Sequence, residues 1–167
     1  EEEFAMDENR MRLDKVLSMS GFGSRKDVKK LIRQGAVFIN DKIAKDPGIQ
    51  VSAEIDEIRV FGERTVFRQF IYILLNKPSG VISSTVESRD LTVIDLLEGV
   101  FSHRDLFPVG RLDRDTEGLI LLTDDGQLAH KLLSPKNRIG KTYYVEVDGV
   151  LDGSDVEAFA KGIVLDD

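Results

Sequence analysis

The chain has 167 residues, of which 41% are hydrophobic and 32% are charged, and its formal net charge is −7. These values are typical of one soluble domain or two small ones. The sequence contains no cysteine, which excludes disulfides and thiolate metal sites, and no apolar run approaches the roughly 20 residues that a membrane-spanning helix needs. We therefore expect a cytoplasmic protein with no membrane partner.

Charge is distributed unevenly over the first 35 residues. Residues 1–10 contain five acidic residues and one arginine, and we interpret them as a leader outside the fold. Residues 11–35 contain seven lysines and arginines against two aspartates. A local basic excess in an acidic chain indicates an anionic partner.

Residues 11–60 are predicted to form two short helices followed by short strands. Apolar residues at helical spacing indicate a first helix over 13–18. Ser24 as the N-cap, with Asp27 three residues later, predicts the start of a second helix, and Gly35 ends it. Short strands are expected at 36–39, near 43 and at 57–60, and residues 61–69 are expected to be a linker.

The second predicted helix has a basic face. Its cations recur at three- and four-residue spacing and lie mostly off the apolar stripe: Arg25, Lys26, Lys29, Lys30 and Arg33. A solvated helix face is the ordinary interpretation of such a pattern. Here only Asp27, at the edge of the face, is available to neutralise it, and we predict that the face contacts phosphate groups.

This half of the chain resembles the S-four-type RNA-binding module, which is named for a small-subunit ribosomal protein. The matching runs are Met11–Leu17, Gly23–Lys26 and Gly35–Lys42. The resemblance implies binding to structured RNA, with Arg12 joining the cations of the basic face as an RNA contact.

The second half is predicted to be a mixed, mainly antiparallel sheet with short helices, so the expected fold class is α+β. Strands are expected over 70–75, 119–123 and 141–147, and helical segments over 92–97, 127–133 and 154–161. In the strand 141–147, Tyr143, Val145 and Val147 alternate onto one face.

Residues 110–118, with the sequence GRLDRDTEG, concentrate charge directly before an apolar run and allow four interpretations. The spacing approaches that of a calcium-binding EF-hand loop, but helices are not expected on either side. A magnesium-dependent nuclease or phosphotransfer site could use Asp113, Asp115, Asp124 and Asp125, although the adjacent arginines would compete with the cation. In the third interpretation the site is metal-free and an aspartate acts as an acid–base group or a nucleophile. A neighbouring guanidinium would favour its ionised carboxylate. The fourth is that the charges only cap a turn.

The motifs of the second half, taken in order, resemble those of the small-subunit rRNA pseudouridine synthases and their large-subunit relatives. The matching segments are Asn76-Lys77-Pro78-x-Gly80, Thr92-Val93-x-Asp95-Leu96-Leu97, Gly110-Arg111-Leu112-Asp113, Asp115-Thr116-x-Gly118-Leu119, Thr123-Asp124-Asp125-Gly126, and Ser134-Pro135 followed by Lys141-Thr142-Tyr143. An S-four-type module in front of them is also the arrangement of this family. The resemblance therefore covers residues 11–167.

The resemblance implies a role for three residues of the catalytic site. Asp113 would be the catalytic carboxylate, Arg111 would pair with it and help to displace the target uridine, and Tyr143 would stack on the flipped uracil. The alternation around Tyr143 leaves a core position as the alternative for that residue. Lys77 is expected at the cleft edge, either as a contact to the RNA backbone or as a structural lysine. Asp115 is assigned to the turn.

The implied reaction breaks the bond between C1′ of ribose and the uracil nitrogen and rejoins the ring through C5. It needs no redox change, and neither a cofactor nor a metal is expected. His103 and His130 fit no dyad or ligand spacing. Whether Asp113 attacks the sugar, attacks the ring or acts as a base stays open. The expected partner is rRNA or a pre-ribosomal particle, with the small subunit favoured by residues 124–130 and Ser134-Pro135.

One departure from the family concerns length, because the family's catalytic domain continues past residue 167. Residues 70–167 are expected to supply only its N-terminal portion, so we expect the chain alone to be inactive and to expose apolar surface around 141–147. The complete protein is expected to be a monomer. The alternative function is that of a non-catalytic RNA-binding or ribosome-assembly factor with an incomplete synthase domain, although the presence of Arg111, Asp113 and Tyr143 argues against it.

Overall fold

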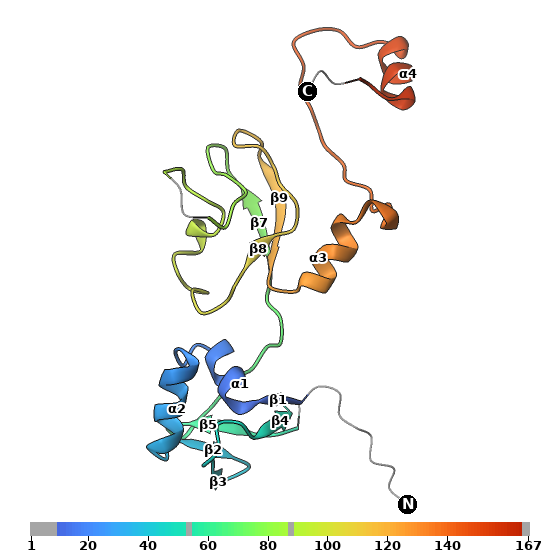
Figure 1. Ribbon diagram of the computed structural model, residues 1–167. Helices are drawn as coiled ribbons and strands as arrows, with labels where there is room; N and C mark the ends of the chain where they lie inside the picture. The colour runs from blue at the N-terminus through green and yellow to red at the C-terminus, as the bar shows by residue number, and fades with distance from the viewer. Residues whose placement is uncertain (1–9, 53–54, 87–88, 165–167) are drawn as a thin grey trace, which may run out of the picture. The chain divides into compact units, whose positions relative to one another are not determined.

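The computed structural model describes residues 10–52, 55–86 and 89–164 (Figure 1). The chain divides into two compact units, residues 1–137 and 138–167, which are described separately. Of the ten residues predicted to be a leader, the first nine lie outside the described residues. Arg10 lies in a strand, so the predicted boundary is wrong by that residue.

The first unit begins with the N-terminal module, residues 10–64. Its elements are β1 (Arg10–Arg12), α1 (Leu13–Met19), α2 (Arg25–Arg33), β2 (Val37–Ile39), β3 (Lys42–Ile43), β4 (Gln50–Ser52), β5 (Ile58–Val60) and β6 (Glu63–Arg64). Strands β1 and β4 pair with each other, and the other four form an antiparallel sheet in the order β3-β2-β5-β6. The two helices bury Leu13, Val16, Leu17, Val28 and Ile32 against the strands.

Local signals in the sequence explain the boundaries of α2. The N–H of Asp27 donates to Ser24 Oγ at 3.3 Å, and the N–H of Ser24 donates to Asp27 Oδ2 at 3.2 Å, which is the predicted capping box. Just past the helix, Gly35 has φ of 73°, a conformation that glycine adopts without strain. Both predicted helices of the module are confirmed.

The predicted linker over 61–69 is partly wrong. Phe61 and Gly62 form a tight turn with φ of 53° and 85°, and β6 then pairs antiparallel with β5. Two residues of strand show no periodicity, which is why the sequence pattern misses them. The connecting segment therefore starts at Thr65.

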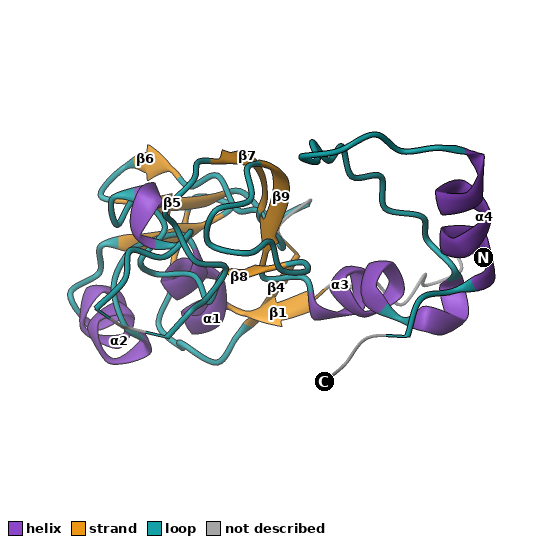
Figure 2. Cartoon of the chain, turned by 90° about the horizontal axis from the view of Figure 1, so that it is seen from above, coloured by secondary structure: helices purple, strands orange, loops and turns teal. Residues whose placement is uncertain are grey.

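The rest of the first unit is the sheet region, residues 70–137. It contains β7 (Tyr72–Lys77), the 3₁₀ helix η1 (Asp95–Leu97), β8 (Phe107–Pro108), β9 (Gly118–Thr123), α3 (Gly126–Leu133) and η2 (Pro135–Asn137). The strands form an antiparallel sheet in the order β7-β9-β8, visible from above in Figure 2, and a single parallel bridge joins Ile82 and Thr92. The α+β class with a mainly antiparallel sheet is confirmed.

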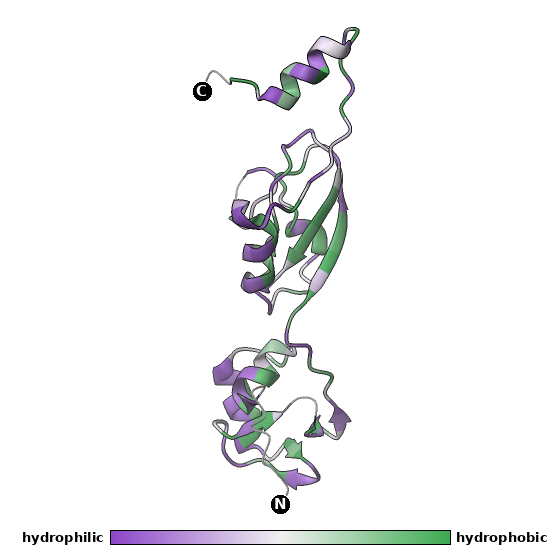
Figure 3. Ribbon diagram, turned by 90° about the vertical axis from the view of Figure 1, so that its right-hand side faces the viewer, coloured by the Kyte–Doolittle hydropathy of each residue, from purple (hydrophilic) through white to green (hydrophobic). Residues whose placement is uncertain are grey.

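The two faces of this sheet differ in burial. One face carries Ile73, Leu75, Ile120 and Leu122, which pack with Val81, Val93 and η1. On the opposite face Leu74 is 71% exposed and Leu119 is 72% exposed. The two long strands of this sheet, β7 and β9, are coloured mostly as hydrophobic in Figure 3.

The second unit contains one regular element, α4 (Gly153–Lys161), which Asp152 and Asp155 cap in a second capping box. The predicted strand over 141–147 is wrong, because these residues have no regular structure. A strand needs a neighbour to satisfy its backbone, and no strand of the described residues pairs with this segment. Its apolar side chains are exposed, as expected, with Tyr143 58% exposed. Among the described residues, no helix has the length and apolar character to cross a membrane.

Candidate active site and RNA-binding surface

The loop that joins β8 to β9 carries the predicted catalytic residues. It leaves the sheet after the N–H of Val109 donates to the Leu121 carbonyl at 2.7 Å. The N–H of Thr116 then donates to the Asp113 carbonyl at 3.1 Å and closes a tight turn. The side chains of Arg111 and Asp113 are exposed. The loop lies between two strands, whereas an EF-hand loop lies between two helices, so the calcium interpretation is wrong.

Lys77, the last residue of β7, anchors this loop through hydrogen bonds to its backbone. Its side chain has no exposed surface, and its Nζ donates to the carbonyls of Pro78 at 3.0 Å, Arg114 at 3.0 Å and Thr116 at 2.7 Å. An ammonium group has three donors, so all of them are used. The predicted contact between Lys77 and RNA is therefore wrong, and the structural alternative holds.

Ser83 fixes the other arm of the loop. Its Oγ donates to the Leu112 carbonyl at 2.9 Å and accepts from the Leu112 N–H at 3.0 Å. The N–H of Gly80 also donates to the Arg114 carbonyl, at 2.8 Å. The backbone on both sides of Asp113 is thus held, while its carboxylate faces solvent. A carboxylate on an anchored loop can act as a nucleophile or a base without a prior rearrangement of the protein.

The predicted ion pair between Arg111 and Asp113 is not formed. Among the described residues, the ion pair that this loop makes joins Arg114 Nη1 to Asp90 Oδ1 at 3.3 Å. Arg111 and Asp113 are two positions apart on a turn and both are exposed, so an ion pair between them would gain little free energy over two solvated charges. The guanidinium of Arg111 is therefore available to an RNA ligand.

Tyr143 lies in the second unit, in the segment without regular structure. Its stacking on a flipped uracil stays a prediction. The core position offered as the alternative is wrong for this structure, because the side chain is mostly exposed.

Asp124 and Asp125, two of the carboxylates in the magnesium interpretation, have structural roles at the far end of β9. Asp124 Oδ1 accepts the Ile71 N–H at 2.9 Å, and Oδ2 accepts Arg104 Nε at 2.6 Å. Asp125 caps α3 and accepts the Tyr72 hydroxyl at 2.8 Å. No cluster of three His, Cys, Asp or Glu side chains in the described ranges is placed to hold a metal ion.

The hydrogen bonds of Asp125 shift two pKa values. The N–H of Leu128, followed by the Tyr72 hydroxyl and the Gln127 N–H, lowers the pKa of the Asp125 carboxyl below its ordinary value. Desolvation opposes this shift. The hydrogen bond between the Tyr72 hydroxyl and Asp125 also raises the pKa of Tyr72, because ionisation of the hydroxyl would break it.

The basic face of α2 is exposed in the structure. Its members Arg25, Lys26, Lys29, Lys30 and Arg33 all reach solvent. Of these, Lys30 pairs with Asp27 at 3.3 Å, within the same helix. The remaining cations of the face form no ion pair with any described residue, so the face is free to bind an anionic ligand.

Arg12 has a different role from the cations of that face. Its guanidinium donates to Asp14 through Nε at 3.1 Å and through Nη2 at 2.9 Å. This contact lowers the pKa of the buried Asp14 carboxyl, against the effect of desolvation. The side chain keeps 49% of its surface exposed, so an RNA contact by Arg12 stays a prediction alongside this structural contact.

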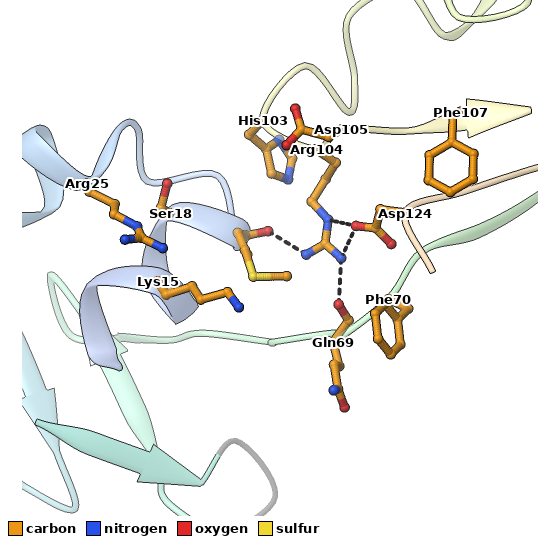
Figure 4. Close-up of a pocket in the computed structure, with 11 residues that line it drawn as sticks. Lys15, Ser18, Arg25, Gln69, Phe70, His103, Arg104, Asp105, Phe107 and Asp124 are labelled. Atoms are coloured by element: carbon orange, nitrogen blue, oxygen red, sulfur yellow. Dashed lines mark hydrogen bonds and ion pairs between the residues drawn. The ribbon is translucent and has the colours of Figure 1, made fainter. Parts of the chain in front are cut away.

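Arg104 is a buried residue that the sequence analysis does not single out. It forms an ion pair with Asp124, and its guanidinium donates to the carbonyls of Met19 at 3.2 Å and Gln69 at 2.8 Å (Figure 4). It also donates to the Arg68 carbonyl at 3.1 Å. It therefore connects the end of α1, the connecting segment and the sheet region. In sequence it is one arginine beside a charged neighbour, and no local signal distinguishes it from a surface residue.

Comparison with known proteins shows the family of each half of the chain. Residues 71–163 match the family model described as RNA pseudouridylate synthase, and residues 11–58 match that of the S4 domain. The uncharacterized RNA pseudouridine synthase YtzG of Bacillus subtilis (strain 168) is 48% identical over 156 residues, covering 93% of this chain and 65% of the relative. The ribosomal large subunit pseudouridine synthase B of the same organism is 37% identical over 157 residues, covering 93% of this chain and 63% of that relative.

The chain thus spans less than two thirds of the length of these relatives. A solved structure described as the crystal structure of a pseudouridylate synthase is 40% identical, with a TM-score of 0.38, and the match covers 76% of this chain and 54% of that one. The S-four-type module and the synthase resemblance predicted from the motifs are both confirmed by the family models.

Proposed function

Because the chain belongs to the RNA pseudouridylate synthase family, we propose that it carries the RNA-binding module and the catalytic loop of an enzyme that isomerises a uridine in structured ribosomal RNA. The glycosidic bond from C1′ to N1 breaks, the uracil turns, and C1′ bonds to C5. The proton lost from C5 is balanced by the one gained at N1, so no oxidant or second substrate is consumed.

The observation that carries this proposal is the anchored loop with an exposed carboxylate. Lys77 and Ser83 hold the backbone on either side of Asp113 through hydrogen bonds of 2.7–3.0 Å. Asp113 can then meet a flipped nucleotide as a nucleophile or as a base, with Arg111 beside it to contact the RNA. A base must leave its stack before such chemistry, and Tyr143 is proposed as its stacking platform.

The choice of rRNA rests on the module and on the named relatives. An RNA-binding module with an exposed basic face suits a folded RNA, and one relative is named for the large ribosomal subunit. The motif features at residues 124–130 and Ser134-Pro135 favour the small subunit. We therefore propose a cytoplasmic enzyme acting on rRNA or a pre-ribosomal particle as a monomer, and both subunit rRNAs should be mapped for its product.

The test is the substitution Asp113→Asn in the full-length protein, with Asp115→Asn as its matched control. Both substitutions remove one exposed carboxylate from the same turn. We expect Asp113→Asn to abolish pseudouridine formation while RNA affinity stays within several-fold, and Asp115→Asn to keep most activity. Pseudouridine is mapped in rRNA from cells that lack the protein and carry each variant.

Two results would contradict the proposal. Retained activity in Asp113→Asn would remove Asp113 from the catalytic role. Full RNA binding with no pseudouridine lost from either rRNA in the deletion strain would instead favour a non-catalytic assembly factor.

A further inference from the structure

A recess lies within the first unit, between α1 and α2 of the module and the Asp124 end of the sheet region (Figure 4). Its volume is about 550 Å³, within the range typical of small-molecule sites. Two cations, Lys15 and Arg25, line it from the module, and two aromatic rings, Phe70 and Phe107, line it from the other side. None of these four residues is used by the Asp113 loop.

The two cations are free to bind an anion. The Lys15 ammonium and the Arg25 guanidinium form no ion pair with another described residue, although Asp14 is close enough to Arg25 for the two charges to interact, and both cations are exposed. Arg25 is also the first residue of α2, so the recess continues the basic face of that helix. An RNA strand that crosses this face therefore meets the recess with its phosphates near Lys15 and Arg25.

The opposite wall suits an unpaired base. Phe70 packs against Tyr72 with ring centroids 6.5 Å apart, which holds its ring in place, and Phe107 is fixed in β8. Aromatic rings are the usual platforms for unpaired bases. Asp105 adds an exposed carboxylate that can accept a hydrogen bond from a base N–H.

The lining of the recess also includes a buried ion pair. Arg104 is buried there, and Asp124 neutralises it in an ion pair. Three cations and two carboxylates, one of them the exposed Asp105, line the recess, so its net charge is +1. The exposed cations, Lys15 and Arg25, both come from the module.

We propose that this recess binds one unpaired nucleotide of the RNA substrate, with its phosphate at Lys15 and Arg25 and its base against Phe70 or Phe107. The proposal rests on the proposed function for the identity of the RNA. The recess lies beyond Thr123, whereas the Asp113 loop enters β9 at Gly118, so β9 separates the two by about 17 Å. The nucleotide bound here is therefore not the one that is isomerised, and the recess contributes to substrate selection.

The first test measures binding of a fluorescein-labelled, single-stranded uridine decamer and of a duplex RNA by anisotropy, using the full-length protein. The double variant Lys15→Gln/Arg25→Gln is compared with Lys42→Gln/Lys45→Gln, which loses the same charge from exposed positions outside the recess. We expect the recess variant to weaken decamer binding about tenfold and to lower the salt slope by about 1.4, at about 0.7 for each phosphate contact on a single strand. Equal losses in the two double variants, or equal losses for decamer and duplex, would overturn the proposal.

The second test needs no variant and so does not depend on folding. The decamer carrying 4-thiouridine is cross-linked to the wild-type protein, and the modified peptides are identified by mass spectrometry. We expect cross-links at the peptides that contain Phe70 and Phe107, and cross-links confined to other peptides would overturn the proposal. Asp113→Asn should leave these cross-links unchanged. If the wild type cross-links in the recess but makes no pseudouridine, the proposed function fails and the recess stands.

Discussion

At the scale of single residues, the loop that carries Asp113 depends on a lysine whose side chain is fully buried. The buried ammonium group of Lys77 donates a hydrogen bond to each of three carbonyls. Two of these carbonyls belong to the turn that presents Asp113. Leaving such carbonyls unpaired in the interior costs about 1–3 kcal/mol each. The position of the loop that carries Asp113 is therefore fixed by a buried residue at the end of β7.

This arrangement predicts the effect of Lys77→Met, which keeps the volume of the side chain but removes its donors. We expect the free energy of unfolding to fall by about 3 kcal/mol, measured by urea denaturation. In the full-length protein, at a temperature where the variant stays folded, kcat for pseudouridine formation should fall far more than KM changes, because the loop is misplaced while the RNA-binding surface is intact. Lys131→Met, which changes an exposed lysine, is the control. A variant with normal kcat would show that the loop holds its shape without Lys77.

At the scale of secondary structure elements, local signals are enough to place several elements from the sequence. The Ser24 and Asp27 pair fixes the start of α2, and a hydrophobic run between turn residues fixes β9. Both depend on neighbours in sequence. The strand predicted over 141–147 fails because alternation alone cannot supply a partner strand.

The basic face of α2 gives a prediction for binding. Replacing Lys26, Lys29 and Arg33 with Gln should weaken RNA binding and flatten its salt dependence, by about 0.9 in slope for each duplex phosphate contact that is lost. Lys30→Gln should change the slope less than a single substitution of Lys26, Lys29 or Arg33 does, because Lys30 already pairs with Asp27. Titration of binding against salt measures the slope. An unchanged slope in the triple variant would exclude this face as the RNA contact.

The cap of α3 gives a prediction for pH. The pKa of Asp125 is lowered in the folded protein, so the carboxylate stabilises the fold above its unfolded pKa, and this contribution is lost as the pH falls through the folded pKa. Between about pH 5 and pH 2, the stability advantage of the wild type over Asp125→Asn should therefore shrink. Urea denaturation at several pH values measures it. A constant difference across this range would show that the charge of Asp125 contributes nothing to the cap.

At the scale of the whole molecule, the sequence proposes catalytic residues but does not show which residues support the loop that carries them. Asp113 and Arg111 are predicted from a short motif, because the residues proposed for the chemistry lie close together in the sequence. Lys77 and Arg104 are misjudged or missed, because their burial is decided by carbonyls brought together from distant segments. Both residues look like surface cations until the fold encloses them.

Arg104 makes the first unit depend on one buried ion pair. It joins Asp124 at the end of β9 to carbonyls of Met19 in the module and of Arg68 and Gln69 in the connecting segment. Its removal leaves Asp124 without its cation and three carbonyls without their donor. Breaking one partner of a buried pair typically costs about 3–5 kcal/mol.

We therefore expect Arg104→Ala to lower the free energy of unfolding by about that amount, and to expose the connecting segment to trypsin at Arg68. Arg104→Lys should restore part of the stability, because a lysine can pair with Asp124 but cannot reach several carbonyls in one plane. Arg89→Ala, which removes an exposed arginine, is the control. If the connecting segment of Arg104→Ala resists trypsin as well as the wild type does, then the contacts of Arg104 do not hold the segment in place. The segment would then have to be held by its other contacts, which include the hydrogen bond from the Thr65 N–H to the Ile58 carbonyl at 2.8 Å and the packing of Phe67 against the core of the module.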